Sequence, residues 1–104
     1  MSAIWFKEYT IDYLEGLRNS NMGQHIGIEF VELGSDYLKG RMPVDKRTTQ
    51  PFGILHGGAS CVLSETLGSV SGWMTIDPEQ YRAVGLELNI NHIRAVTKGH
   101  VIGI

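Results

Sequence analysis

Hydrophobic and polar positions repeat with two different periods along this chain, and the changes of period mark the elements that the sequence predicts. After Thr10, a favourable N-cap residue, apolar side chains at helical spacing predict a short helix; they are Ile11, Leu14 and Leu17. Two alternating runs with a turn at 34–36 then predict a β-hairpin over residues 26–44, although Leu33 falls one place out of step. A loop is expected over residues 45–51.

The longest pattern has the helical period and covers residues 57–74. The side chains of its wide, mainly apolar face are Ala59, Val62, Leu63, Thr66, Leu67, Val70 and Trp73. The opposite side carries small residues and one acid, Glu65. Because a helix without a solvated face is normally buried, we expect this helix to be covered on nearly all sides.

Strand-like alternation returns after the long helix. Over residues 84–94 every second position continues one face, first apolar and finally His92 and Arg94, which predicts a strand that begins at Arg82. A turn and a last strand are expected over residues 98–104. The order of elements predicts an α+β fold in which an antiparallel sheet wraps around one central helix.

The composition is that of one ordinary globular domain spanning residues 1–104, with 42% hydrophobic and 19% charged residues. A net charge of −2 does not attract nucleic acid or an acidic membrane to the surface as a whole, so we expect neither as a partner. A single cysteine, Cys61, excludes an internal disulfide and is typical of the reducing cytosol. No signal-peptide pattern is present, and no apolar run approaches the ~20 residues of a membrane span, so we expect a cytoplasmic protein.

Glu65 is the most unusual residue chemically. It is the only side chain between Thr48 and Ile76 that is certain to be ionised as a free group. Because an isolated carboxylate is costly to bury unless it is paired, hydrogen-bonded or protonated, we interpret Glu65 as the reactive group. The histidines show no HExxH or CxxC spacing, so no metal site is expected, and no GxSxG, phosphate-loop or GxGxxG motif is present.

The central run QPFGILHGGASCVLSETLGSVSGW, with PVDKRTTQPFG before it and VGLELNINHIRA after it, resembles the hot-dog-fold acyl-CoA thioesterases. The similarity is greatest to the 1,4-dihydroxy-2-naphthoyl-CoA thioesterases and their PaaI-like relatives, and it extends over essentially the whole chain. It implies the hot-dog fold and hydrolysis of an acyl-CoA thioester, with aryl-CoA substrates ahead of fatty ones. Members of that family continue past the equivalent of Ile104 with further strands, so we expect additional chain or a partner to cover the open sheet edge.

The resemblance also implies roles for single residues in the reaction. Thioester hydrolysis needs a carboxylate that attacks the carbonyl or activates water, and hydrogen-bond donors where the oxygen becomes negative. Glu65 would be the nucleophile or general base, and Gly57 would donate its backbone N–H to the oxyanion. Gln50 would polarise or orient the substrate, His56 would line the acyl pocket, and Ser69 would hold the carboxylate or a water.

The same resemblance implies where coenzyme A binds. The strand that carries Gly85 would contact the nucleotide through His92, Ile93, Arg94 and Ala95. Close relatives have a serine in place of Ala95, so the resemblance does not imply the corresponding phosphate hydrogen bond for this chain. No cofactor is expected, because coenzyme A enters as part of the substrate.

The spacing of Gly57 and Glu65 carries a structural consequence. They lie eight residues apart on one predicted helix, which is about 12 Å at the standard rise, so one carbonyl cannot touch both. If both act on one thioester, the N–H and the carboxylate must come from different subunits. The sequence therefore predicts a symmetric homodimer with composite sites, which the resemblance extends to a dimer of dimers.

Most of these residues also have a purely structural interpretation. Gly57-Gly58 would equally allow close helix packing, and His56 would equally cap the helix. Ser69 would equally pack against a neighbouring helix, and His92 and Arg94 would equally form a solvated strand end. Three further side chains suit either an acyl pocket or the core: Phe52, Trp73 and Met74.

Two other functions stay open on the sequence alone. Hot-dog dehydratases move protons on a 3-hydroxyacyl thioester with a His and an acidic helix residue, which His56 and Glu65 would imitate. Their separation of nine residues argues against contact within one chain. A non-catalytic acyl-CoA binding module is the other alternative.

Overall fold

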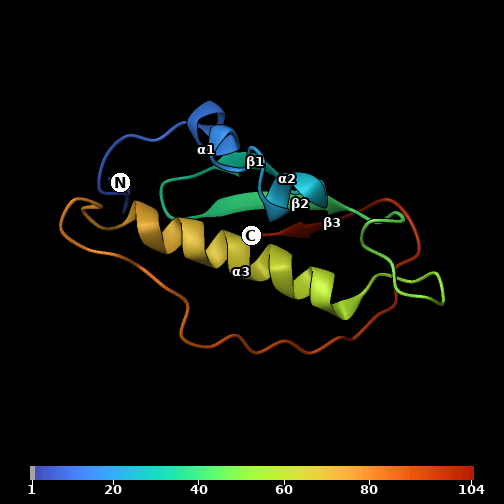
Figure 1. Ribbon diagram of the computed structural model, residues 1–104. Helices are drawn as coiled ribbons and strands as arrows, with labels where there is room; N and C mark the ends of the chain where they lie inside the picture. The colour runs from blue at the N-terminus through green and yellow to red at the C-terminus, as the bar shows by residue number, and fades with distance from the viewer. Residues whose placement is uncertain (1) are drawn as a thin grey trace.

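The computed structural model describes residues 2–104 and contains one antiparallel sheet packed against one long helix (Figure 1). Its elements are α1 (Ile11–Leu17), α2 (Met22–His25), β1 (Glu29–Leu33), β2 (Leu38–Pro43), α3 (Gly57–Met74) and β3 (His100–Gly103). The expected arrangement, an antiparallel sheet with one central helix, is therefore present. Within the described residues, no helix is long and apolar enough to cross a membrane.

Two short helices precede the sheet. Helix α1 begins as predicted, because Thr10 Oγ1 accepts a hydrogen bond of 3.1 Å from the Tyr13 N–H. Helix α2 was not predicted, since four residues are too few to show a helical period. Asn21 caps α2 by accepting from the Gly23 N–H at 3.1 Å.

Strands β1 and β2 form the predicted hairpin, with a bulge that the sequence pattern hints at. The register shifts between Phe30 and Glu32, so Val31 lies outside the regular pairing. Phe30 is buried and Val31 is exposed. The bulge reverses the inward and outward parity beyond it, which explains why Leu33 is out of step in the sequence.

Strand β3 pairs with β2 and makes β2 the central strand of the sheet. The predicted turn before β3 is confirmed, and Gly99 adopts a φ of +84° there, a left-handed conformation that favours glycine. The Val44 N–H donates to the Gly99 carbonyl at 2.8 Å, which fixes the start of β3 against the end of β2.

Helix α3 packs on one face of this sheet and buries Leu63 and Leu67 there. The approach is close: a Cβ on Gly40 of β2 would lie 2.9 Å from Leu67 Cδ2 and 3.1 Å from the Glu29 backbone oxygen. The buried core consists of Tyr9, Leu14, Ile28, Phe30, Leu38, Met42, Leu63, Leu67 and Met74. This core holds α3 at a fixed position relative to the sheet.

The strand expected from Arg82 to Arg94 is absent in this structure, so that prediction is wrong here. The segment is extended but pairs with no strand of the described residues, and Figure 1 shows it running along α3 on the side away from the sheet. Extended backbone forms a strand only where a neighbour pairs with its N–H and C=O groups. Leu86 and Ile93 are accordingly almost fully exposed.

The expectation that α3 is covered on nearly all sides is also wrong for this structure. Ser64, Glu65 and Gly68 on its small-residue side are exposed. The extended segment passes along this side, but a strand-like segment without paired neighbours does not seal a helix face. The sheet covers the opposite, apolar side of α3.

Candidate active site

The N-terminus of α3 presents a free backbone donor. His56 is the N-cap, and its Nδ1 accepts a hydrogen bond of 2.8 Å from the Gly58 N–H. The structural role considered for His56 is thus present. The N–H of Gly57, the first residue of α3, donates to no acceptor in residues 2–104, so it points out of the helix with the positive end of the helix dipole.

The loop before α3 fixes Gln50 beside this helix end. The buried hydroxyl of Thr48 donates to the Pro43 carbonyl at 2.7 Å and anchors the loop to the end of β2. A tight turn follows, in which the Gly53 N–H donates to the Gln50 carbonyl at 3.0 Å. Gln50 Oε1 accepts from the Phe52 N–H, which leaves the side-chain NH₂ of Gln50 to donate to another group.

An ion pair stiffens the same loop. Arg47 donates to the Asp45 carboxylate from Nη2 at 2.7 Å. The side-chain hydrogen bonds from Arg47 lower the pKa of Asp45 to about 2. Both side chains are solvent-accessible, so the pair contributes little to the free energy of unfolding at neutral pH.

A single backbone hydrogen bond brings the predicted nucleotide-binding residues to this loop. The Leu55 N–H donates to the Val96 carbonyl at 2.8 Å and so ties the start of α3 to the end of the extended segment. The result is a hollow of about 370 Å³, here called the helix-mouth hollow. It is lined by Gln50, Ile54, Leu55, Gly57, Ser60, His92, Ile93, Arg94 and Ala95.

His92 lies closest to the helix end within this hollow. A Cβ on Gly57 would lie 2.8 Å from His92 Nε2, so the imidazole sits against the backbone of Gly57. The small size of glycine at position 57 therefore allows the imidazole of His92 to approach the helix end, which differs from the close helix packing considered for this residue. His92 itself is exposed.

Glu65 occupies a second hollow, farther along α3. Its Oε1 accepts a hydrogen bond of 2.7 Å from Ser69 Oγ, one helical turn away, and the carboxylate lies against Gly85 of the extended segment. This hollow of about 210 Å³ is here called the Glu65 groove. It is lined by Ser64, Glu65, Gly68, Ser69, Gly72, Ala83, Val84, Gly85, Glu87 and Leu88.

The enclosure expected around Glu65 is not found, because its side chain is exposed in this chain. The expected hydrogen bond to Ser69 is present. Glu65 therefore has a fixed partner and a solvent-accessible carboxylate.

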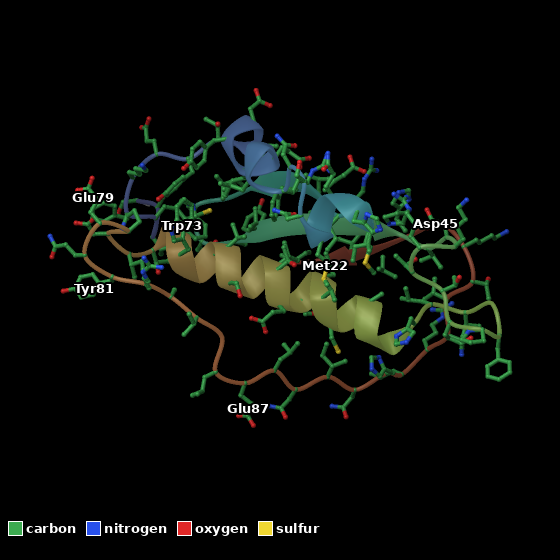
Figure 2. The ribbon with its side chains drawn as sticks, viewed as in Figure 1. Met22, Asp45, Trp73, Glu79, Tyr81 and Glu87 are labelled. Atoms are coloured by element: carbon green, nitrogen blue, oxygen red, sulfur yellow. The ribbon has the colours of Figure 1, made fainter. Side chains whose placement is uncertain are left out.

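A third hollow, here called the α1–α3 cavity, begins at Glu65 and extends under the N-terminal helices. Its volume is about 330 Å³. Figure 2 shows Met22 between α2 and α3, at the side of this cavity. The cavity is lined by Leu17, Arg18, Asn21, Met22, Gly23, Ile28, Phe30, Glu65, Thr66, Ser69 and Val70.

Sequence reasoning missed the N-terminal wall of this cavity. The sequence predicts a helix face that includes Leu17, but nothing in the sequence places that face beside Glu65. The three aromatic or sulfur side chains considered for an acyl pocket lie elsewhere. Met74 is fully buried in the core, Phe52 is 86% exposed, and Trp73 stacks on Tyr13 with ring centroids 6.3 Å apart.

The predicted site residues thus fall into two groups in one chain. Gln50, Gly57 and residues 92–95 share the helix-mouth hollow. Glu65, Ser69 and Gly85 share the Glu65 groove. His56 lines neither of these two hollows.

The sequence matches one protein family and several curated relatives. Residues 52–104 match the model described as the thioesterase superfamily. The 1,4-dihydroxy-2-naphthoyl-CoA hydrolase of Escherichia coli is 46% identical over 101 residues, which are 97% of this chain and 74% of that protein. The proofreading thioesterase EntH of Cronobacter turicensis is also 46% identical over 101 residues, covering 97% of this chain and 73% of the relative.

Solved structures show the same likeness in three dimensions. A thioesterase from Haemophilus influenzae matches with a TM-score of 0.90 and 43% identity, covering 95% of this chain and 68% of that one. A mutant thioesterase from Pseudomonas aeruginosa matches with a TM-score of 0.93 and 41% identity, covering 96% and 72%. Both solved structures therefore resemble this chain in fold as well as in sequence.

Proposed function

This chain belongs to the thioesterase superfamily of hot-dog proteins, and we propose that it hydrolyses acyl-CoA thioesters in which the acyl group is aromatic. The hot-dog fold and the thioester hydrolase class expected from the sequence are confirmed. The substrate, the site residues and the oligomeric state belong to the proposal.

The observation that carries the proposal is the Glu65 carboxylate, held by Ser69 and facing an open groove. In the reaction, Glu65 attacks the thioester carbonyl carbon or takes a proton from the water that attacks it. The carbon–sulfur bond then breaks and coenzyme A leaves as a thiol. On the nucleophilic route, water afterwards hydrolyses the mixed anhydride formed on Glu65, and on either route the acid is released. Ser69 keeps one carboxylate oxygen in place and leaves the other free for this chemistry.

The oxyanion donor in this proposal is the free N–H of Gly57 from a second copy of the chain. Within one copy the two groups are eight residues apart, about 12 Å along the helix, which is too far for one carbonyl. A two-fold axis that sets two α3 helices antiparallel would bring each Gly57 to the other Glu65. Gln50 then adds a side-chain donor beside Gly57, and residues 92–95 contact coenzyme A from the same helix-mouth hollow.

The aromatic preference rests on the relatives. The Escherichia coli relative is named for hydrolysis of 1,4-dihydroxy-2-naphthoyl-CoA, and EntH is named a proofreading thioesterase. The α1–α3 cavity supports a compact acyl group, because its volume of about 330 Å³ is at the small end of the range for ligand pockets.

Thiol-release kinetics test the proposal. The wild-type protein is expected to release coenzyme A from benzoyl-CoA with a higher kcat/KM than from a long-chain acyl-CoA. Glu65→Gln is expected to lose at least about a hundredfold in kcat, while Glu65→Asp keeps a shortened carboxylate and loses less. Wild-type kinetics on Glu65→Gln would overturn the role of Glu65.

The same experiment separates the alternatives. Water addition to a crotonyl-type thioester without thiol release would identify a hydratase that uses His56. Tight binding of acyl-CoA with no thiol released, unchanged in Glu65→Ala, would identify a binding module. Neither outcome is expected, because the hydrolase class is shared with relatives 46% identical to this chain.

A further inference from the structure

The direction in which the acyl group leaves the reactive centre is set by the hollows beside Glu65. Two hollows meet at this residue, the Glu65 groove of about 210 Å³ and the α1–α3 cavity of about 330 Å³. On the α3 side the groove is lined by small residues and Glu65, and the extended segment adds Val84, Leu88 and the charged Glu87. The cavity is larger and has apolar walls that include Ile28, Phe30 and Val70. Transfer of an aromatic acyl group out of water favours the cavity.

The wall of the cavity that faces away from α3 is not purely apolar, because Arg18 lies in it. Arg18 is the C-cap residue of α1, and its side chain is only 26% exposed. Its Nε donates to Glu15 Oε2, which holds the guanidinium at the cavity. A guanidinium has five N–H donors, so this ion pair leaves those of the two terminal nitrogens for another acceptor.

The neighbouring polar residue of the same wall has no comparable capacity. Asn21 donates from Nδ2 to the Leu17 carbonyl at 2.6 Å and accepts at Oδ1 from the Gly23 N–H at 3.1 Å. Both ends of its side chain are therefore engaged in holding α2. Asn21 keeps one free N–H, whereas Arg18 keeps those of two nitrogens together with a positive charge, so Arg18 is the stronger donor of this wall for a polar substituent on a ligand.

We propose that Arg18 is a specificity-determining residue that selects acyl groups carrying a hydroxyl on the aromatic ring, at a position remote from the thioester. With the carbonyl at Glu65, the ring lies in the α1–α3 cavity and its far edge meets Arg18. The guanidinium donates a hydrogen bond to the hydroxyl oxygen, and an ionised phenol binds more tightly still. This inference rests on the proposed function for the placement of the carbonyl.

The test compares Arg18→Gln with wild type on benzoyl-CoA and on its 2-, 3- and 4-hydroxy derivatives. Wild type is expected to favour the 3- or 4-hydroxy substrate over benzoyl-CoA. Arg18→Gln is expected to lose about tenfold in kcat/KM for that hydroxylated substrate, the size of one hydrogen bond to a charged group, and to keep its kinetics on benzoyl-CoA. Arg18→Lys retains a positive charge and shows whether the planar guanidinium is needed.

Arg41→Gln is the matched control. Arg41 also donates through Nε to a glutamate, Glu29, at 3.2 Å, but its side chain is exposed on the β1–β2 hairpin and lies outside the α1–α3 cavity. This variant is expected to show wild-type kinetics on every substrate. Circular dichroism of each variant confirms that α1 is intact. If Arg18→Gln does not fold, Arg18→Lys and Arg18→Met carry the comparison.

A binding measurement makes the inference independent of turnover. Phenacyl-CoA and 4-hydroxyphenacyl-CoA carry a methylene between sulfur and carbonyl and are not hydrolysed. Calorimetry is expected to give a lower Kd for the hydroxylated compound with wild type, and equal Kd values with Arg18→Gln. Equal values already in wild type, or an equal loss for both compounds in the variant, would overturn the role of Arg18. Absence of aryl-CoA hydrolysis by wild type would instead overturn the proposed function.

Discussion

The Glu65 carboxylate lies directly against the backbone of Gly85, so that a Cβ added at position 85 would collide with Glu65 Oε1. The contact joins the middle of α3 to the extended segment, two parts of the chain 20 residues apart in sequence. The atom in the way is the end of a flexible side chain, so the carboxylate can move aside at small cost in stability. A side chain at position 85 therefore changes the position of the carboxylate more than it changes the fold.

Gly85→Ala is expected to reduce kcat about tenfold or more on an aryl-CoA. The added methyl group pushes the Glu65 carboxylate aside and so removes it from its productive geometry. The melting temperature is expected to change by only a few degrees. Gly16→Ala is the matched control, since a Cβ there meets no atom within 4 Å. A large loss of melting temperature in Gly85→Ala, or unchanged kcat, would contradict this reading of the contact.

A second glycine tests the packing of α3 on the sheet. A Cβ at Gly40 would press on both the Leu67 side chain and the backbone oxygen of Glu29. Backbone cannot give way as a side chain can, so Gly40→Ala is expected to lower the free energy of unfolding by about 1–3 kcal/mol. Urea denaturation measures this change.

Gly68→Ala provides the contrast for that measurement. Position 68 lies on α3 with nothing within 4 Å of an added Cβ. The substitution is expected to stabilise the helix by up to about 1 kcal/mol, since glycine is a poor helix former. Equal changes in the free energy of unfolding for Gly40→Ala and Gly68→Ala would show that the close approach at Gly40 is not rigid.

The acid side of the stability curve tests the Asp45–Arg47 pair. Hydrogen bonds from Arg47 lower the pKa of Asp45 from 3.8 to about 2 in the folded protein. A lowered folded pKa contributes stability above the unfolded value, and this contribution is lost as the pH falls from about 4 through about 2. Asp45→Asn is therefore expected to flatten the fall in melting temperature over that interval.

The control for the acid measurement is Asp36→Asn, because Asp36 is exposed and forms no ion pair within residues 2–104. Its acid profile is expected to follow wild type. The effect at Asp45 will be small, since the pair is exposed to solvent. A wild-type slope in Asp45→Asn would show that the pair does not persist in solution.

Much of this fold follows from local patterns in the sequence. The period of α3, the cap at Thr10 and the turn at Gly99 all depend on neighbouring residues, and the structure contains each of them. The segment after Arg82 has an equally clear alternation, yet it forms no strand here. Alternation determines which side chains share a face, but pairing needs a neighbour, and the sequence of the segment cannot supply one.

The residues of the candidate site likewise divide into those that local sequence patterns indicate and those that only tertiary packing brings together. The free N–H at Gly57 and the Ser69 bond to Glu65 follow from spacing along one helix, so the sequence could indicate them. The wall of the α1–α3 cavity around Arg18 depends on how α1 and α2 lie against α3. That arrangement results from tertiary packing at residues with no motif of their own, and a single sequence does not reveal it.

The central claim is that each active site combines Glu65 of one subunit with the Gly57 N–H of another. Gly57→Pro deletes that N–H at the first position of a helix, where proline is well tolerated, and its ring also displaces the exposed His92 side chain. Glu65→Gln deletes the carboxylate. Each variant alone is expected to be nearly inactive. In a mixed dimer, one of the two sites would be formed by the intact Glu65 of the first variant and the intact Gly57 of the second.

The direct measurement is therefore thiol release from benzoyl-CoA after the two variants are mixed in equal amounts and their subunits are exchanged. Random pairing gives mixed dimers with one working site each, and the mixture is expected to reach about a quarter of wild-type activity. Activity no higher than that of the separate variants, once mass spectrometry has shown that mixed dimers are present, would contradict the composite site.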